Sequence, residues 1–403
     1  LVAWMVESGM RAARAQFEAG QVKVVQGRAG LLPQIGLAAD TTYTDADFRT
    51  RVPPGSSSPS YNSNGYGVQL TQPLFRWQNW VQFKQGELQT ALAETQFGIA
   101  RQDLVLRVAE AYFNVLNAQD ALAAVTQLRT AAGEQLELAK TSFEVGTVTI
   151  TDVHEAQSRF DLASAQEIAA QNLLEVARQT LAQIIGKQPE ALAGLREGVA
   201  LQRPQPENIV DWVAAAESGG FGVQAQQLVR EIAVREVERA RAGHLPTVDV
   251  VARHGVNNDL QLSAGRNEVT SVGLQLNVPL FAGGRVSSVS REAAALRMKA
   301  DADLEDARRS AALAARQSWL GVTSGMAQVK ALEAARVSST SALDANKLGY
   351  EVGVRINIDV LNAQTQLADT LQKLARARYD TLLAQLRLKA AAGTLGEDDV
   401  RAI

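Results

Sequence analysis

The sequence predicts a mainly α-helical protein with some β-structure, built from two copies of one structural unit. Two runs of helix-forming residues, 77–140 and 286–347, contain no proline. Both are far longer than the helices of ordinary globular domains. The segment after the first run, FEVGTVTITDV at 143–153, recurs after the second as YEVGVRINIDV at 350–360. Self-similarity over about half the chain indicates an internal duplication.

The first copy is expected to occupy residues 1–187. Its opening helix ends at RAGLLP, where Gly30 and Pro33 give the usual stop signals. Two runs of alternating apolar and polar residues then flank the turn-rich RVPPGSSSPSYNSNG, which predicts a β-hairpin. In order, the copy should contain a helix to about Gly30, a hairpin at about 33–77, a helix over 77–140, a break at 143–153 and a helix over about 152–185.

The second copy is expected at 222–392, after a linker at 188–221 that carries three prolines. A helix again ends at RAGHLP, which matches RAGLLP, and GLQLNVPLF shares six of nine residues with the earlier GVQLTQPLF. In order, this copy should contain a hairpin at about 246–282, a helix over 286–347, a break at 350–360 and a last helix to about Ala392, followed by a C-terminal segment at 393–403.

Composition excludes several classes of function. The chain has 403 residues, a net charge of -3 and no cysteine. This charge gives no basic footprint for nucleic acid, and the lack of cysteine excludes disulfides and thiolate catalysis. No stretch approaches 18 consecutive apolar residues, so no transmembrane helix is expected.

No motif predicts an enzyme. GFGVQA at 220–225 fits a dinucleotide-binding pattern, but it follows a helical stretch where that motif requires a strand. The three histidines, His154, His244 and His254, lie apart and have no carboxylate at helical i, i+4 spacing. We therefore expect no catalytic residues, no metal and no cofactor.

The predicted strands do not suffice for a closed sheet. One chain supplies four strands, and an open sheet would leave exposed edges. Three chains would supply twelve, and helices continuing from the strands would form a second, coaxial cylinder. Aromatic residues at the strand-to-helix transitions suit either a membrane-interface belt or ordinary packing, and these are Phe75, Trp77, Trp80 and Phe281.

Motifs in both copies resemble the TolC family of outer-membrane efflux channels. They are ARAGLLPQI, AYFNVL, QPLF and VPLFAGGR, with EVG followed by TDV in the first copy and by IDVLNAQTQL in the second. The resemblance implies a TolC-like trimer with a 12-stranded outer-membrane β-barrel, four strands per chain, continuous with a long periplasmic α-helical barrel. It implies the outer membrane of a Gram-negative bacterium, with a large periplasmic part.

The same resemblance implies a passive channel that carries substrates from an inner-membrane complex to the exterior, in type I protein secretion or multidrug efflux. The implied partners are a homotrimer, a periplasmic membrane-fusion adaptor, an ABC or proton-driven inner-membrane transporter, and outer-membrane lipid. A soluble helical scaffold or adaptor protein is the alternative. It explains the helices and the repeat but leaves the four alternating strands unexplained.

The two breaks are expected to be helix-turn-helix corners. Gly146 and Gly353 suit left-handed helix ends, and Asp152 and Asp359 stand six residues on, where each could cap the next helix. The resemblance adds that the corners form a periplasmic entrance. It further implies that an adaptor docks at the two exposed corners, around Val145, Gly146, Val352 and Gly353.

The resemblance also assigns gate residues within the corners. Tyr350 and Arg355 occupy positions that link the inner helix pair to its neighbour, with Asp152 and Thr151 as acceptors. A guanidinium can hold a carboxylate by two hydrogen bonds. Asp359 matches the constriction aspartate, and Asn362 stands where relatives often carry a second acid. The entrance of a trimer would then carry one ring of three carboxylates.

Overall fold

The computed structural model describes residues 9–58, 60–189, 192–194, 201–258 and 265–401. The chain divides into two compact units. A helical unit comprises Leu1–Gln16, Thr95–Gln224 and Glu305–Ile403, and a sheet unit comprises Phe17–Glu94 and Ala225–Leu304. Each unit draws on both halves of the chain, so the units cut across the two sequence copies. The copy boundaries therefore stay a prediction.

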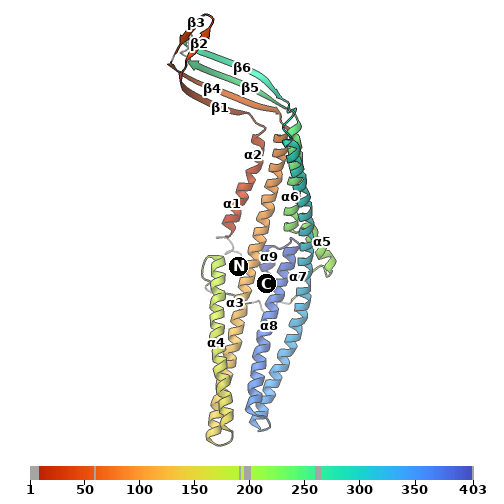
Figure 1. Ribbon diagram of the computed structural model, residues 1–403. Helices are drawn as coiled ribbons and strands as arrows, with labels where there is room; N and C mark the ends of the chain where they lie inside the picture. The colour runs from red at the N-terminus through yellow and green to blue at the C-terminus, as the bar shows by residue number, and fades with distance from the viewer. Residues whose placement is uncertain (1–8, 59, 190–191, 195–200, 259–264, 402–403) are drawn as a thin grey trace. The chain divides into compact units, whose positions relative to one another are not determined.

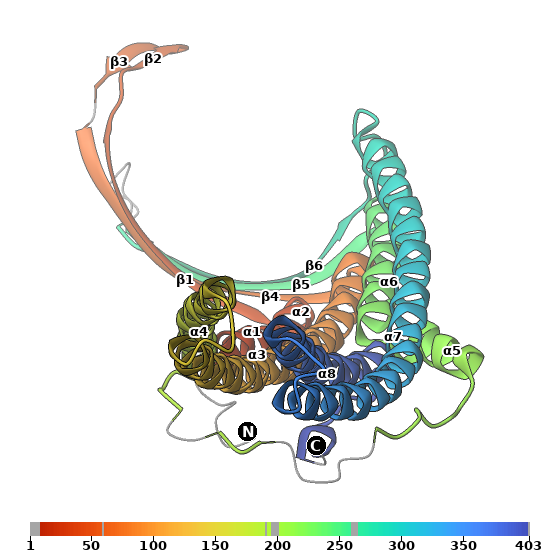
Figure 2. The ribbon, with the colours of Figure 1, turned by 90° about the horizontal axis from the view of Figure 1, so that it is seen from below.

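The sheet unit contains one four-stranded antiparallel sheet (Figure 1). Its two predicted hairpins are joined by pairing between β4 and β5, and the sheet is curved (Figure 2). In spatial order the strands are β1 (Gln34–Asp45), β4 (Ser60–Phe75), β5 (Thr247–Asn258) and β6 (Asn267–Asn277).

The loop expected between the first two strands holds a small hairpin that the sequence did not reveal. β2 (Phe48–Arg51) pairs with β3 (Pro54–Ser57), and Val52 and Pro53 form the turn between them. Clusters of proline and serine suit turns better than strands, which hid this element. In the second hairpin, β6 ends at Asn277, before Pro279, because proline cannot donate a ladder hydrogen bond.

The register places apolar residues of all four strands on one face. Residues that pair directly share a face, as in Ile35 with Leu70, Leu70 with Ala252, and Ala252 with Val272. The opposite face carries polar residues and glycines, such as Gln69, Arg253 and Gly273. The apolar face consists of Ile35, Leu37, Ala39, Tyr43, Tyr66, Val68, Leu70, Val248, Val250, Ala252, Val256, Val272, Leu274 and Leu276.

Helices adjoin the sheet through small residues. The single opening helix expected from the sequence divides into α1 (Gly9–Gln21) and α2 (Lys23–Ala29). Gly20 meets Ala93, and Gly27 meets the backbone of Phe83, at points where a Cβ atom has no room. Small residues seven positions apart thus let α1 and α2 approach α3 (Trp77–Glu144) closely. The sheet unit also holds most of α6 (Phe221–Arg241), the 3-10 turn η2 (Ala242–His244) and the start of α7 (Arg285–Glu351).

The helical unit consists of two long antiparallel pairs (Figures 1 and 2). α3 turns back into α4 (Ile150–Ile185), and α7 turns back into α8 (Asn357–Ala391). The predicted apolar face of α3 is buried at Val105, Val108 and Val115. Two short helices complete the unit, α5 (Ile209–Gly219) and α9 (Glu397–Arg401). Of the helices in the described residues, none has the length and apolar character needed to cross a membrane.

Candidate functional site

The first corner joins α3 to α4 and is fully capped. Gly146 has a φ of 78°. Its N–H donates to the carbonyl of Phe143 at 2.9 Å, and the Thr147 N–H donates to that of Ser142 at 2.9 Å. α4 then begins with a capping box, in which the Thr149 N–H donates to Asp152 Oδ2 at 2.9 Å and the Asp152 N–H donates to Thr149 Oγ1 at 3.4 Å. Asp152 therefore caps α4 as expected, from its third position.

The second corner joins α7 to α8 and is capped less well. Gly353 has a φ of 77°, and its N–H donates to the carbonyl of Tyr350 at 3.0 Å. α8, however, begins at Ile356, whose side chain cannot accept a hydrogen bond, so the helix has no side-chain cap. The expected capping by Asp359 is absent. Asp359 Oδ2 lies instead 3.7 Å from Arg355 Nη1 of the same helix turn.

Tyr350 and Asp152 are brought together across the two corners. Burial raises the pKa of Tyr350 above its ordinary value, and the nearby carboxylate of Asp152 raises it further. A hydrogen bond with the side chain of Ser142 acts in the opposite direction. Tyr350 on α7 is therefore linked to the end of α3. Ser142 was not predicted from the sequence.

Two other predicted gate residues have different partners within the chain. Arg355 contacts Asp359, and within the described residues it does not reach Asp152 or Thr151. Asn362 accepts a hydrogen bond at 2.9 Å from Nη2 of Arg159, which lies on α4. A link from Arg355 to a neighbouring chain stays a prediction.

The corners expose apolar side chains. Val145 is 70% exposed and Val352 is 67% exposed. Each stands directly before the glycine of its corner, where a left-handed residue turns the chain away from the helix. Val354 and Ile356 are also exposed. The corners therefore present apolar surface at the ends of both helix pairs.

Farther from the corners, α8 is fastened to α3 by an apolar and hydrogen-bonded cluster. The rings of Phe113 and Tyr379 stack at 5.9 Å between centroids, and the Tyr379 hydroxyl donates to Asp120 Oδ2 at 2.7 Å. Burial, with the bond to Asp120, raises the pKa of the Tyr379 hydroxyl well above its ordinary value. Leu382, Leu383 and Leu386 are packed into the same cluster. The sequence suggested a buried face here but not the hydrogen bond to Asp120.

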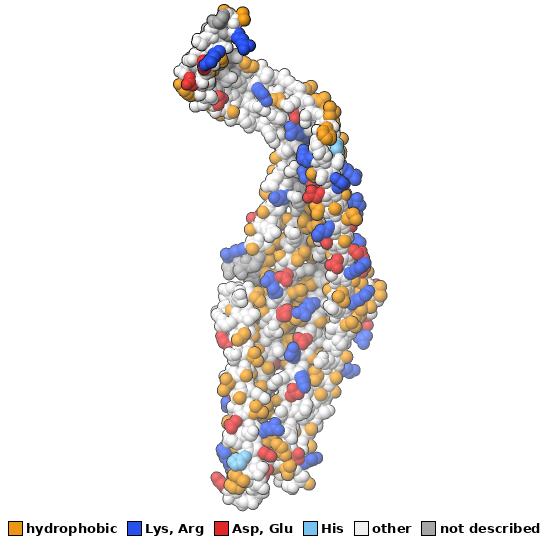
Figure 3. Space-filling view, in the orientation of Figure 1, with side chains coloured by type: hydrophobic (Ala, Val, Ile, Leu, Met, Phe, Trp, Pro, Cys, Tyr) orange, Lys and Arg blue, Asp and Glu red, His pale blue; other side chains and the backbone are white. Residues whose placement is uncertain are grey.

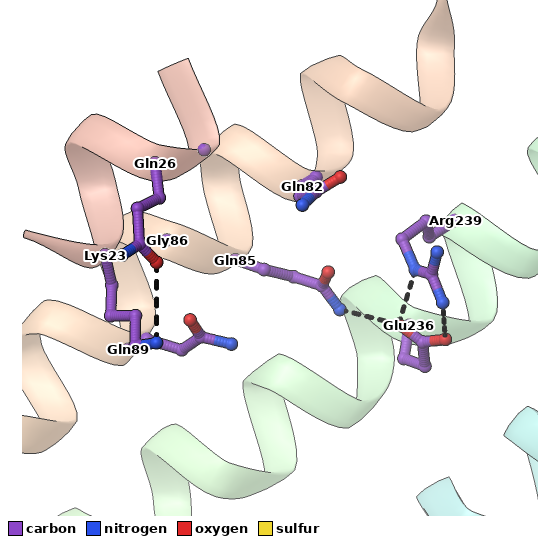
Figure 4. A pocket seen from close by; sticks show the side chains of 9 residues that line it. Lys23, Gln26, Gln82, Gln85, Gly86, Gln89, Glu236 and Arg239 are labelled. Atoms are coloured by element: carbon purple, nitrogen blue, oxygen red, sulfur yellow. Dashed lines mark hydrogen bonds and ion pairs between the residues drawn. The ribbon is translucent and has the colours of Figure 1, made fainter. Parts of the chain in front are cut away.

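A polar pocket of about 320 Å³ lies within the sheet unit (Figure 4). α3, α2 and α6 line it with amide and charged side chains. Arg239 holds Glu236 by two hydrogen bonds of 2.8 Å and 2.6 Å, and Gln85 donates to Glu236 Oε2 at 3.0 Å. The bonds from Arg239 lower the pKa of Glu236, against the opposing effect of burial, and the bond from Gln85 lowers it further. This network ties α3 to α6.

The lowered pKa of Glu236 predicts an acid-sensitive contribution to stability. Its contribution is complete above the ordinary carboxyl range and is lost as the pH falls through the lowered pKa, below about pH 4. The melting temperature of the wild type should exceed that of Glu236→Gln at neutral pH, and the difference should shrink on acidification. Glu231→Gln, on the same helix, is the control. An equal difference for both variants at every pH would contradict the assignment.

The aromatic residues expected at a membrane interface are exposed. Phe75 ends β4, Trp77 begins α3, and Trp80 and Phe281 also expose their rings. Trp77 Nε1 donates to Glu238 at 3.1 Å. Between strand and helix, Arg76 holds the buried Asp249 of β5 by two bonds of 2.7 Å. The transition is thus fixed by an ion pair while its aromatic rings face outward.

No cluster in the described residues suits metal binding, since no three side chains of histidine, cysteine, aspartate or glutamate converge there. A family model described as "Outer membrane efflux protein" matches residues 8–187 and 213–394. The chain belongs to the outer membrane efflux protein family. The predicted resemblance to TolC-type channels is therefore confirmed.

Relatives of this outer membrane efflux protein are similar over almost its whole length. "Outer membrane protein TolC" of Escherichia coli K12 is 34% identical over 98% of this chain and 81% of its own. "Alkaline protease secretion protein AprF" of Pseudomonas aeruginosa is 31% identical over 98% of this chain and 83% of its own. The chain is thus an outer-membrane channel of the secretion and efflux class, as predicted.

Solved structures share the fold. The outer membrane protein VceC of Vibrio cholerae superposes with a TM-score of 0.82 at 20% identity, covering 96% of this chain and 92% of its own. The CmeC outer membrane channel of Campylobacter jejuni gives a TM-score of 0.84 at 16% identity, covering 99% and 86%. The predicted mainly α fold with β-structure is confirmed. The family is one of transport proteins rather than enzymes, and the soluble scaffold alternative is wrong.

Proposed function

We propose that three copies of the chain form one outer-membrane channel that is gated at its periplasmic corners. The observation that carries this proposal is the sheet, which has one apolar face and two open edges. Leu37 and Leu274 on that face are 75% and 74% exposed in the single chain. Such a face is costly in water and suited to lipid.

The edges of the sheet support the number of copies. Among the described strands, β1 and β6 each pair on one side only. Open edges invite pairing with another chain, and closure removes them. Four strands from each of three copies give a sheet of twelve that closes with its apolar face outward. Phe75, Trp77, Trp80 and Phe281 would then lie at the membrane interface as an aromatic belt.

The corners support the position of the gate. Tyr350 is linked to Ser142 on α3, and Asn362 to Arg159 on α4, so two polar contacts hold α7 and α8 against the other pair. Exposed contacts of this kind are worth about 0–1 kcal/mol each. A gate held by such contacts stays shut alone and yields when a partner binds the open state better.

The exposed corners offer a docking surface for a periplasmic adaptor. Val145 and Val352 present apolar side chains beside Gly146 and Gly353. A helical adaptor tip could cover these side chains and so favour one arrangement of the helix pairs. An ABC or proton-driven transporter of the inner membrane would supply the passenger, because the channel has no nucleotide-binding motif of its own.

Asp359 provides the test of the proposed entrance. In a trimer its three carboxylates would form a ring, and at about 6 Å each pair repels by about 0.7 kcal/mol in water and by more in a narrow pore. A ring of this kind favours cations. Asp359→Asn should therefore reduce cation selectivity and the block by divalent cations, as measured by reversal potentials in planar lipid bilayers.

Asp369→Asn is the matched control for that experiment. Asp369 lies on the same helix and also pairs with a cation four residues away, since Lys373 Nζ is 2.6 Å from its carboxylate. Its selectivity should equal that of the wild type. Unchanged selectivity and block in Asp359→Asn would show that the entrance is not lined by this carboxylate.

A further inference from the structure

We infer that Asn357 is a positioning residue that lowers the cost of separating α8 from α3 and α4 near the corners. The inference rests on the proposed gate, because it concerns how easily the two helix pairs part. We call the contact of residues 357–364 with α3 and α4 the seam. Every residue of the seam belongs to the helical unit.

The middle of the seam is an ordinary apolar contact. Leu361 is 2% exposed and packs against Leu136 and Ala139 of α3 and Ala156 of α4. Asn357 lies one helical turn before Leu361, on the same side of α8, and is 1% exposed. An amide thus occupies a site with the burial of a core leucine.

The hydrogen bonds of Asn357 are incomplete. Its Nδ2 donates to the backbone carbonyl of Asp152 at 3.5 Å, at the outer limit for such a bond. Its Oδ1 is buried and has no partner within the described part of the chain. A buried acceptor without a partner loses its hydration when the seam closes and regains it when the seam opens. Asn357 therefore weakens the closed seam.

A second amide repeats this arrangement on the other side of Leu361. Gln364 is 6% exposed, and its Oε1 likewise lacks a partner in the described residues. Asn357 and Gln364 are seven residues apart, which places both on one face of α8. The apolar contact of the seam is therefore one leucine between two poorly satisfied amides.

The two copies within the chain differ at this position. When FEVGTVTITDV is placed on YEVGVRINIDV, Asn357 corresponds to Ile150, and Ile356 corresponds to Thr149. Thr149 caps α4, whereas Ile356 leaves α8 without a side-chain cap. α8 therefore begins with an uncapped turn and a buried amide, and both features reduce its hold on the seam.

The contrast with the rest of α8 indicates where the helix would move. Around Tyr379 the same helix is held by stacked rings, by leucines and by the 2.7 Å bond to Asp120. The far part of α8 can thus stay packed while residues 357–364 separate and Asn357 becomes hydrated. This division needs no change at the Tyr379 cluster.

Replacing Asn357 with leucine, which has a similar shape, tests the inference. Asn357→Leu removes the unsatisfied acceptor, so the seam should open about 5- to 150-fold less often, the range expected for one buried polar group. Two readouts apply to the purified detergent-solubilised channel. Amide hydrogen exchange over 357–364 should slow by that factor, and the open probability in planar bilayers should fall.

Ile150→Asn is the matched control, because Ile150 is 47% exposed and lies outside the seam. It should leave both readouts at the wild-type level. Asn357→Ile, which copies the first corner, should act like Asn357→Leu. Exchange over 379–388 reports on folding and should stay unchanged.

The outcomes separate this inference from the proposed gate. Wild-type exchange over 357–364 in both Asn357 variants, in protein that conducts normally, would overturn the inference and leave the gate standing. Loss of protection over 379–388 in both variants would also overturn it, since the site would then reject apolar side chains. A wild-type protein that forms no channels would instead contradict the proposed function, while the exchange data would still decide the role of Asn357.

Discussion

Replacing Gly86 with leucine should prevent α2 from packing against α3 and should strongly destabilise the sheet unit. A Cβ atom at this position would lie 2.7 Å from the carbonyl oxygen of Lys23 and 3.1 Å from Cα of Val24. Both are backbone atoms, which cannot rotate away as a side chain could. Overpacking of this kind costs about 1–3 kcal/mol or more.

The sign of this effect is informative because helix propensity alone predicts the opposite. Leucine is favoured over glycine inside a helix by somewhat less than about 1 kcal/mol. Gly222→Leu on α6 is therefore the control, since a Cβ atom at Gly222 meets nothing within 4 Å. Thermal unfolding followed by circular dichroism should show a large loss for Gly86→Leu and none for Gly222→Leu. Equal melting temperatures for Gly86→Leu and the wild type would contradict the close packing.

The repeat and its long helices could be predicted because their signals are local. The α3 helix was expected over 77–140 and spans Trp77–Glu144, and both corner glycines adopt the expected left-handed conformation. Periodicity and stop residues act within a few turns, so they can be read from the sequence. The β2–β3 hairpin was missed because its prolines and serines hid a short strand pair.

The partners of the site residues could not be predicted, because they depend on which helices lie side by side. Tyr350 was expected to act through Asp152, and it does lie near that residue, yet its hydrogen bond is to Ser142. Arg355 was expected to reach Asp152, whereas within the chain it meets Asp359. The poor capping of α8 was visible in the sequence, since Ile356 stands where the first copy has Thr149.

Charged side chains of both signs are interspersed with apolar ones along the helices (Figure 3). Most of the ion pairs join residues three or four positions apart, as between Lys299 and Asp303 or Arg376 and Asp380. Such pairs support single helices and give little direction to packing between helices. Specific links across the helix pairs are therefore few, and this gives weight to Tyr350, Arg159 and Asn357.

The double variant Tyr350→Phe with Arg355→Ser should open the channel. Loss of the Tyr350 hydroxyl removes the link to Ser142, and loss of Arg355 removes the cation that could reach a neighbouring chain. If each lost contact is worth about 0.5–1 kcal/mol, three copies sum to about 1.5–3 kcal/mol, which shifts the open-to-closed ratio about 10- to 100-fold. The first copy supports this design, since it carries Phe143 and Val148 at these positions.

Single-channel conductance of this variant beside the wild type, in planar lipid bilayers, tests the central claim that the corners form the gate. Arg376→Ser is the control, because Arg376 pairs with Asp380 on the exposed side of α8 at 3.6 Å. We expect a low conductance for the wild type and for the control, and a several-fold higher conductance for the double variant. Equal conductance for all three proteins would contradict a gate at the corners.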